Sequence, residues 1–258
     1  SDTLVKPDHI TVNEAPVVFV NKANANPVKD GTSWSTAFTT LQAGIDAAQA
    51  LGGGQVWTAK GVYNEARSNS TGTLQMRELV AVLGGFNGDE TSLEARNPQA
   101  NVTVIDGAAA LSGNAAYHVV TGANNARLDG FTVRGGRARV SGFASSTQFG
   151  GGMFNLGVSP QVAHCTFTDN TAVSLGGAMY NSSAKIVMES CVFNQNSVSN
   201  AGDPNSFALG GAVYNTNSTL TAVNCEFLRS TATSNATWPG GAENVSSQAL
   251  GGAVYNFN

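Results

Sequence analysis

The chain has 258 residues, thirty glycines, 12 % charged residues and a formal net charge of −4. This length suffices for one sizeable core or one capped solenoid, and the many glycines with few charges indicate many turns and little helix. Because binding to phosphates needs clustered Lys and Arg, we expect no nucleic-acid partner. No apolar run reaches the roughly 18 residues of a membrane span, so we expect no membrane-spanning segment.

The first fifth of the sequence predicts an N-terminal cap. Residues 1–20 form a lead-in that ends in a strand, and residues 21–55 form a capping segment. A helix is expected at about 36–50, with Ser35 as its N-cap and glycines 52–54 as its end. A helix there would cover the exposed end of a solenoid. The apolar residues at helical spacing on one face are Phe38, Leu41, Ile45 and Ala48.

The rest of the chain, 56–258, is predicted to form the rungs of a parallel β-helix. A six-residue phrase that begins with two glycines and ends in asparagine recurs at 150–155, 176–181, 210–215 and 251–256. A cysteine follows fifteen residues after the first glycine of the first three copies, and a phenylalanine lies two residues beyond it. Such repetition is typical of a solenoid, here with three short strands in each rung. The repeated residues are Cys165, Cys191 and Cys225, then Phe167, Phe193 and Phe227.

Alternation within the first strand of each rung predicts which side chains point inward. The apolar residue and the asparagine, two positions apart, should both face the core, where the asparagines could form an amide ladder. The aromatic residue between them should face outward as a column. The asparagines are Asn155, Asn181, Asn215 and Asn256. The aromatic residues are Phe154, Tyr180, Tyr214 and Tyr255.

The cysteines are interpreted as a buried ladder of free thiols. All three occupy one repeat position, and stacked neighbours in a parallel sheet have poor geometry for a disulfide. A metal site is the alternative, but His164 beside Cys165 has no metal-binding partner at its position in the next rungs.

The spacing between successive phrases grows from 26 to 34 to 41 residues. The additional residues fall after the third strand of each rung, in segments rich in Ser, Asn, Ala, Gly and Pro. We therefore expect corner loops at 171–175, 197–209 and 231–250, stacked along one edge of the solenoid.

These patterns together resemble the pectin-lyase-like right-handed parallel β-helix superfamily. The segments 30–42, 56–63 and 83–93 resemble the opening of large secreted bacterial surface proteins. The double-glycine phrases and the Phe-x-x-Asn pattern at 167–170 and 193–196 resemble polymorphic outer-membrane protein repeats, from which the third copy departs at Ser230. The resemblance implies an all-β right-handed solenoid, secreted or displayed on a bacterial surface. The fold hosts lyases, hydrolases and adhesins alike, so activity has to be argued from the site.

The sequence contains few candidates for catalysis. A glycoside hydrolase needs two carboxyl groups within about 10 Å, and a lyase needs a Lys or Arg base, commonly with Ca²⁺. No paired aspartates and no Asp-rich cluster are found, and most charged side chains are interpreted as isolated and exposed to solvent. Arg134 and Asp169 are the weak catalytic candidates. The turn at Asp89 and Glu90 could hold Ca²⁺, although a plain surface turn is the simpler interpretation; otherwise no cofactor is expected.

The leading functional hypothesis is a non-catalytic extracellular structural or adhesive protein. Its corner loops would contact a polysaccharide or a cell-surface component, and the aromatic column with Trp238 could stack on sugar rings. A structural stack under the long loops is the alternative role of that column. A polysaccharide lyase or hydrolase is the second functional hypothesis. The third is a subunit of a head-to-tail fibre, in which other protomers dock on an open C-terminal end.

Overall fold

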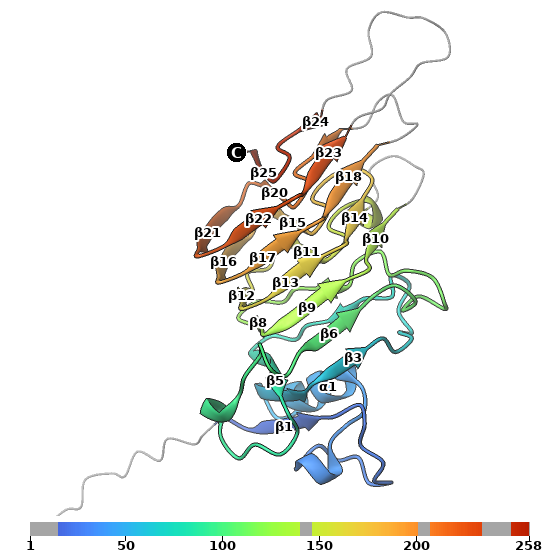
Figure 1. Cartoon of the computed structure of the whole chain (residues 1–258), viewed down its shortest axis with the longest axis vertical. Coiled ribbons are helices and arrows are strands. Elements are labelled where there is room, and N and C mark those ends of the chain that lie inside the picture. The colour runs from blue at the N-terminus through green and yellow to red at the C-terminus, as the bar shows by residue number, and fades with distance from the viewer. Residues whose placement is uncertain (1–14, 140–145, 201–206, 234–248, 258) are drawn as a thin grey trace, which may run out of the picture.

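The computed structural model describes residues 15–139, 146–200, 207–233 and 249–257. Successive rungs stack along the long axis, with the N-terminal end at the bottom of Figure 1 and the last rung at the top. Every pairing between named strands in the described ranges is parallel. The chain is therefore a right-handed parallel β-helix, as the repeats predict.

Three long sheets form the walls of the solenoid. Sheet A contains, in order, β1 (Val17–Val20), β2 (Gly54–Ala59), β5 (Val80–Phe86), β8 (Arg127–Asp129), β12 (Gln161–Ala163), β16 (Lys185–Glu189) and β21 (Thr219–Val223). Sheet B contains β3 (Gly61–Tyr63), β6 (Thr103–Asp106), β9 (Phe131–Arg134), β13 (Thr166–Thr168), β17 (Val192–Asn194) and β22 (Glu226–Leu228). Sheet C contains β4 (Leu74–Gln75), β7 (Val120–Thr121), β11 (Met153–Leu156), β15 (Met179–Ser182), β20 (Val213–Thr216) and β25 (Val254–Phe257).

The corner segments differ from the loops expected there, because part of each continues the sheet pattern. Alternate side chains in them, including Val198 and Ala208, are buried in a small core of their own. This burial gives the short strands a reason to form. A fourth sheet contains β10 (Arg137–Ala138), β14 (Thr171–Ala172), β18 (Ser197–Ser199) and β23 (Thr231–Thr233), and a further pair joins β19 (Ala208–Leu209) to β24 (Ala249–Leu250).

The helix is shorter than the sequence predicts. The 3₁₀ turn η1 (Trp34–Thr36) comes first, capped by Ser33 rather than Ser35, and α1 (Leu41–Ala50) follows. Between them Phe38 is extended, because its N–H donates to the carbonyl of Phe19 at 2.9 Å and it bridges to β1. Two further 3₁₀ turns are η2 (Leu93–Ala95) and η3 (Ser146–Gln148).

The helix nevertheless covers the N-terminal end of the main core. Leu41, Ile45 and Ala48 are fully buried and belong to the same apolar cluster as the inward residues of the rungs. Gly44 permits the close approach to sheet A, since a Cβ atom there would lie 2.3 Å from a methyl carbon of Val20.

Columns of identical residues run along the inside of the solenoid. Asn155 donates to Asn181 at 2.8 Å, Asn181 to Asn215 at 2.6 Å, and Asn215 to Asn256 at 2.7 Å, so the amides form a continuous ladder. The rings of Phe167, Phe193 and Phe227 stack 5.0 and 4.9 Å apart. All three cysteines are free; Cys165 and Cys191 are buried, and Cys225 in the last rung is partly exposed.

Candidate functional site

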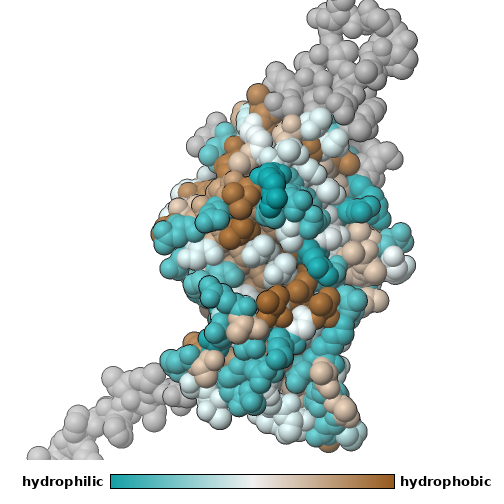
Figure 2. Space-filling view, in the orientation of Figure 1, coloured by the Kyte–Doolittle hydropathy of each residue, from teal (hydrophilic) through white to brown (hydrophobic). Residues whose placement is uncertain are grey.

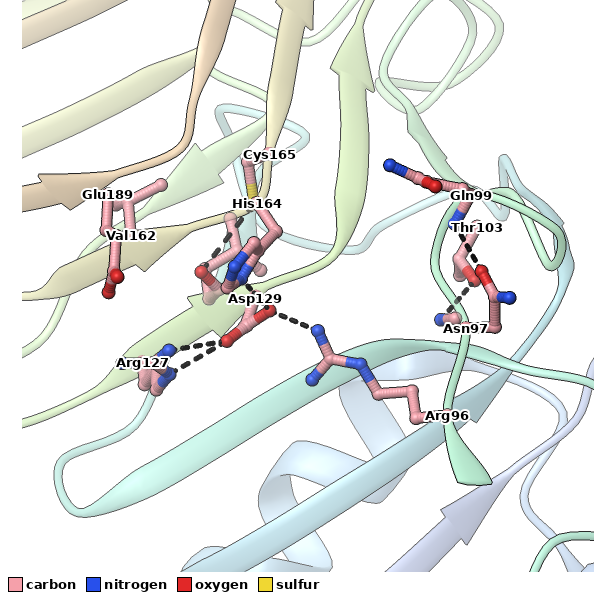
Figure 3. A network of polar contacts seen from close by, with 12 residues as sticks. Arg96, Asn97, Gln99, Thr103, Arg127, Asp129, Val162, His164, Cys165 and Glu189 are labelled. Atoms are coloured by element: carbon pink, nitrogen blue, oxygen red, sulfur yellow. Dashed lines mark hydrogen bonds and ion pairs between the residues drawn. The ribbon is translucent and has the colours of Figure 1, made fainter. Parts of the chain in front are cut away.

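A buried carboxylate at a corner of the solenoid collects three basic side chains (Figure 3). Asp129 ends β8, and its side chain is only 5 % exposed. One oxygen pairs with Arg96 and lies 3.1 Å from Nδ1 of His164, while the other accepts from Nε and Nη2 of Arg127 at 3.0 and 2.6 Å. We call these four residues the Asp129 cluster.

The rungs themselves place three members of this cluster. In sheet A, Asp129 pairs with Ala163, so His164 at the next corner lies one rung above Gly130. Arg127 lies two residues before Asp129 on the same strand, on the same face of the sheet.

Arg96 comes from the connection between β5 and β6, which folds back over the corner. The fold needs glycine at position 130: φ there is +79°, and a Cβ atom would lie 2.9 Å from Nη2 of Arg96. The loop itself is held by Gly85, whose carbonyl accepts from the N–H of Asn97 at 2.9 Å. The cluster therefore ties a long connection to the stacked rungs.

The electrostatics keep Asp129 ionised. Burial by itself raises the pKa of Asp129, but hydrogen bonds and charge from Arg96 and then Arg127 outweigh it, and the pKa lies below its usual value. A carboxylate whose two oxygens are both bonded to guanidinium groups is a weak proton acceptor. It serves instead to orient His164, whose ring is 49 % exposed.

Two grooves meet at this cluster. One, of about 670 Å³, lies between the loop around Arg96 and the outer face of sheet B. The other, of about 530 Å³, extends over sheet A, with Ala81 and Leu83 in its floor. Arg96, Pro98 and His164 line both. The polar residues of the first groove besides Arg96 and His164 are Asn97, Gln99, Thr103, Thr132, Thr166 and Ser190.

The catalytic candidates from the sequence lie elsewhere and are not paired with each other. Arg134 ends β9 and bonds Asp106 through Nε and Nη2, both at 2.9 Å. Asp169 lies in an exposed turn with a φ of +55° and accepts from the hydroxyl of Thr168 at 2.8 Å. No ion pair joins Arg134 to Asp169 in the part of the chain that the structure describes.

The turn at Asp89 and Glu90 is organised by its own hydrogen bonds. The Glu90 carboxylate accepts backbone N–H groups of Asn87, Gly88 and Asp89, and the Asn87 amide donates to Asp89 at 3.0 Å. Partial burial raises the pKa of Glu90, but these N–H groups more than offset it and the pKa is lowered. Across the described ranges, no group of three or more His, Cys, Asp or Glu side chains is arranged to hold a metal ion.

The aromatic column points away from the main core, but three of its four rings are buried. Phe154, Tyr180 and Tyr214 are 9, 8 and 7 % exposed, and Phe149, Leu175 and Leu209 pack against them with Tyr255. Neighbouring rings from Phe154 to Tyr255 stack 5.3 to 5.6 Å apart, nearly parallel. Of the two roles considered for the column, this packing favours the structural stack over a sugar-stacking surface. Trp238 lies outside the described residues.

Sequence reasoning missed the site for two different reasons. Residues 127–136 align without gaps on 161–170, which places Asp129 and His164 one rung and one residue apart, although the charges were interpreted mostly as isolated. That signal was available. Arg96 lies outside any repeat, so no spacing could assign it to this corner.

Comparisons with known proteins indicate the family but no activity. Two crystal structures of the pectin methylesterase from Aspergillus niger, in penultimately deglycosylated and deglycosylated forms, are similar to the chain with TM-scores of 0.35 and 0.27. Each shares 13 % identity, and the alignment covers 95 % of this chain and 86 % of the other. No curated protein matches in sequence.

Among the described residues, no helix is long and apolar enough to cross a membrane. The family DUF1565, described as a protein of unknown function, matches residues 23–226. This match spans most of the sequence, and the chain therefore belongs to the DUF1565 family.

Proposed function

We propose that this protein is a non-catalytic, extracellular structural or adhesive β-helix, secreted or held at a bacterial surface, that contacts glycans through the groove beside the Asp129 cluster. The observation that carries the proposal is that Asp129, the buried acid at the groove, is bonded to arginine at both oxygens. A carboxylate held by two guanidinium groups positions its neighbours and is not itself a free base.

The arrangement of acids argues against hydrolysis. A glycosidase needs one carboxyl group protonated and a second one opposite it across the bond. Asp129 has a lowered pKa and is fully paired. Asp169 lies in an exposed turn, and Arg134 is occupied by Asp106.

The lining of the larger groove suits sugar hydroxyls. Its amide and hydroxyl side chains offer both donors and acceptors, which is what recognition of neutral polyols requires. Thr132 and Thr166 are paired on neighbouring strands of sheet B, so matching hydroxyls repeat along the groove at the strand spacing of about 4.8 Å. The face toward the viewer in Figure 2 is mostly hydrophilic or neutral, with hydrophobic residues in separate patches.

The test compares two substitutions on one strand. Thr166 and Thr168 both face outward from β13, but only Thr166 lines the groove. Thr166→Arg should abolish binding to the glycans retained by the wild-type chain on a polysaccharide array, and Thr168→Arg should leave it intact. Neither the wild type nor the variants should release sugars from those glycans.

Equal binding by both variants would refute the groove as the contact surface. Sugar release that His164→Ala abolishes would refute the non-catalytic proposal and favour a polysaccharide hydrolase or lyase.

A further inference from the structure

A second, smaller pocket lies at the capped end of the solenoid, away from the Asp129 cluster. It has a volume of about 320 Å³ and lies between the start of α1, the segment 65–69 and β4. Two oppositely charged side chains, Glu65 and Arg67, line it together.

Arg67 is buried, and three of its five N–H donors have no partner among the described residues. The residue is 7 % exposed, and its Nη1 donates to the carbonyls of Gly72 at 3.0 Å and Val119 at 3.2 Å. Its Nε and Nη2 are buried and have no partner among the described residues. These two nitrogens form one edge of the planar guanidinium, the fork that receives a carboxylate with two parallel hydrogen bonds.

Glu65 is in the complementary state. Its Oε1 accepts the N–H of Leu41 at 3.1 Å and so caps the N-terminus of α1, where Thr40 makes no side-chain cap. Its Oε2 is buried and lacks a partner within the described part of the chain. Glu65 and Arg67 do not form an ion pair there, so each keeps an unused, charged hydrogen-bonding edge.

The other charged groups of the pocket are already used. Asp46 pairs with Arg77 at 2.9 Å, and the Gln42 amide donates to Asp46 at 3.0 Å and accepts from the N–H of Gln75 at 2.9 Å. The unsatisfied pair is therefore specific to Glu65 and Arg67. Because leaving charged groups buried and unpaired is costly, a partner held inside the pocket would stabilise both.

We propose that this pocket binds a small carboxylate that carries a hydroxyl or ammonium group on the neighbouring carbon. Nε and Nη2 of Arg67 and Oε2 of Glu65 are buried, so binding requires both side chains to turn these edges toward the pocket. The ligand carboxylate then accepts two hydrogen bonds from Nε and Nη2 of Arg67, and the adjacent donor of the ligand bonds Oε2 of Glu65. Both orphaned edges are then satisfied, and the ligand charge compensates the buried guanidinium.

The probes are lactate, L-alanine and lactamide, titrated calorimetrically into the full chain. Lactate and L-alanine share the carboxylate and differ in the donor, whereas lactamide keeps the hydroxyl of lactate and lacks the charge. We expect lactate or L-alanine to bind at least about tenfold more tightly than lactamide, because a charged acceptor roughly doubles the strength of each bond. The tighter acid identifies the donor that faces Glu65.

Two kinds of variant locate the binding. Arg67→Lys keeps the charge but removes the fork, and should weaken binding about tenfold or more. Ser68→Phe narrows the pocket from an exposed position that it lines, and should also abolish binding. Ser70→Phe is the matched control, because Ser70 is exposed on the same segment and does not line the pocket.

Several results would overturn the proposal. If neither lactate nor L-alanine binds more tightly than lactamide, no carboxylate site exists. Identical behaviour of Ser68→Phe and Ser70→Phe would place binding elsewhere, even if Arg67→Lys fails to fold. Absence of binding of either acid to the folded wild-type chain would mean that only water satisfies Arg67 and Glu65.

Discussion

Replacement of Asn181 by alanine tests how much the amide ladder contributes to stability. Asn181 accepts from Asn155 at 2.8 Å and donates to Asn215 at 2.6 Å, and all three side chains are buried. The substitution leaves one donor and one acceptor unpaired in the core. At about 1–3 kcal/mol for each of the two groups, the free energy of unfolding should fall by roughly 2–6 kcal/mol. That is a large part of the roughly 5–15 kcal/mol typical of a folded domain.

The assay is denaturant unfolding followed by circular dichroism, with Ser182→Ala as the control. Ser182 follows Asn181 on β15 and points to the opposite side of the strand. Its loss should change stability by less than about 0.5 kcal/mol, as is usual for surface substitutions. A loss below about 1 kcal/mol in Asn181→Ala, or an equal loss in both variants, would refute the view that the ladder stabilises the rungs.

Three further predictions concern buried ionisable groups. Burial raises the pKa of the Cys191 thiol to about 12. Brief treatment of the folded protein with N-ethylmaleimide should therefore modify the partly exposed Cys225 first. Early modification of Cys191, detected by mass spectrometry, would contradict the packing. Burial lowers the pKa of His118 from 6.5 to about 4. The stabilisation is therefore fully present above pH 6.5, and the free energy of unfolding should fall by about 3 kcal/mol as the pH drops to 4. Unfolding curves of His118→Leu should lack this pH dependence, and an unchanged dependence would assign it to other groups. Asp129→Asn should lower the free energy of unfolding by roughly 3–5 kcal/mol, because Arg96 stays buried without its counter-ion. Amide hydrogen exchange should become faster in the connection that carries Arg96. Unaltered exchange there would show that the ion pair does not hold this connection in place.

The sequence predicted the solenoid because repetition is a property of the chain itself. Equal spacing from each double glycine to its cysteine places residue over residue, and the pairing of Phe167 with Phe193 follows that count. Alternation then separates Met179 and Asn181, both buried in the core, from Tyr180 between them. Where no repeat exists, the prediction was less accurate: Phe38 was assigned to the helix but is extended, because its backbone bonds to β1.

The tertiary structure alone decided what covers the rungs and which charges meet. The aromatic column lies outside the main core, as alternation requires, yet Leu209 and its neighbours bury it, and no periodicity within a strand indicates what packs over its outer face. Arg96 reaches Asp129 from the non-repeating connection between β5 and β6. Arg67 and Glu65 come together where a different connection, between β3 and β4, meets the cap. Spacing within one chain determines neighbours along a repeat, whereas contacts made by non-repeating segments depend on how those segments fold back across the repeat.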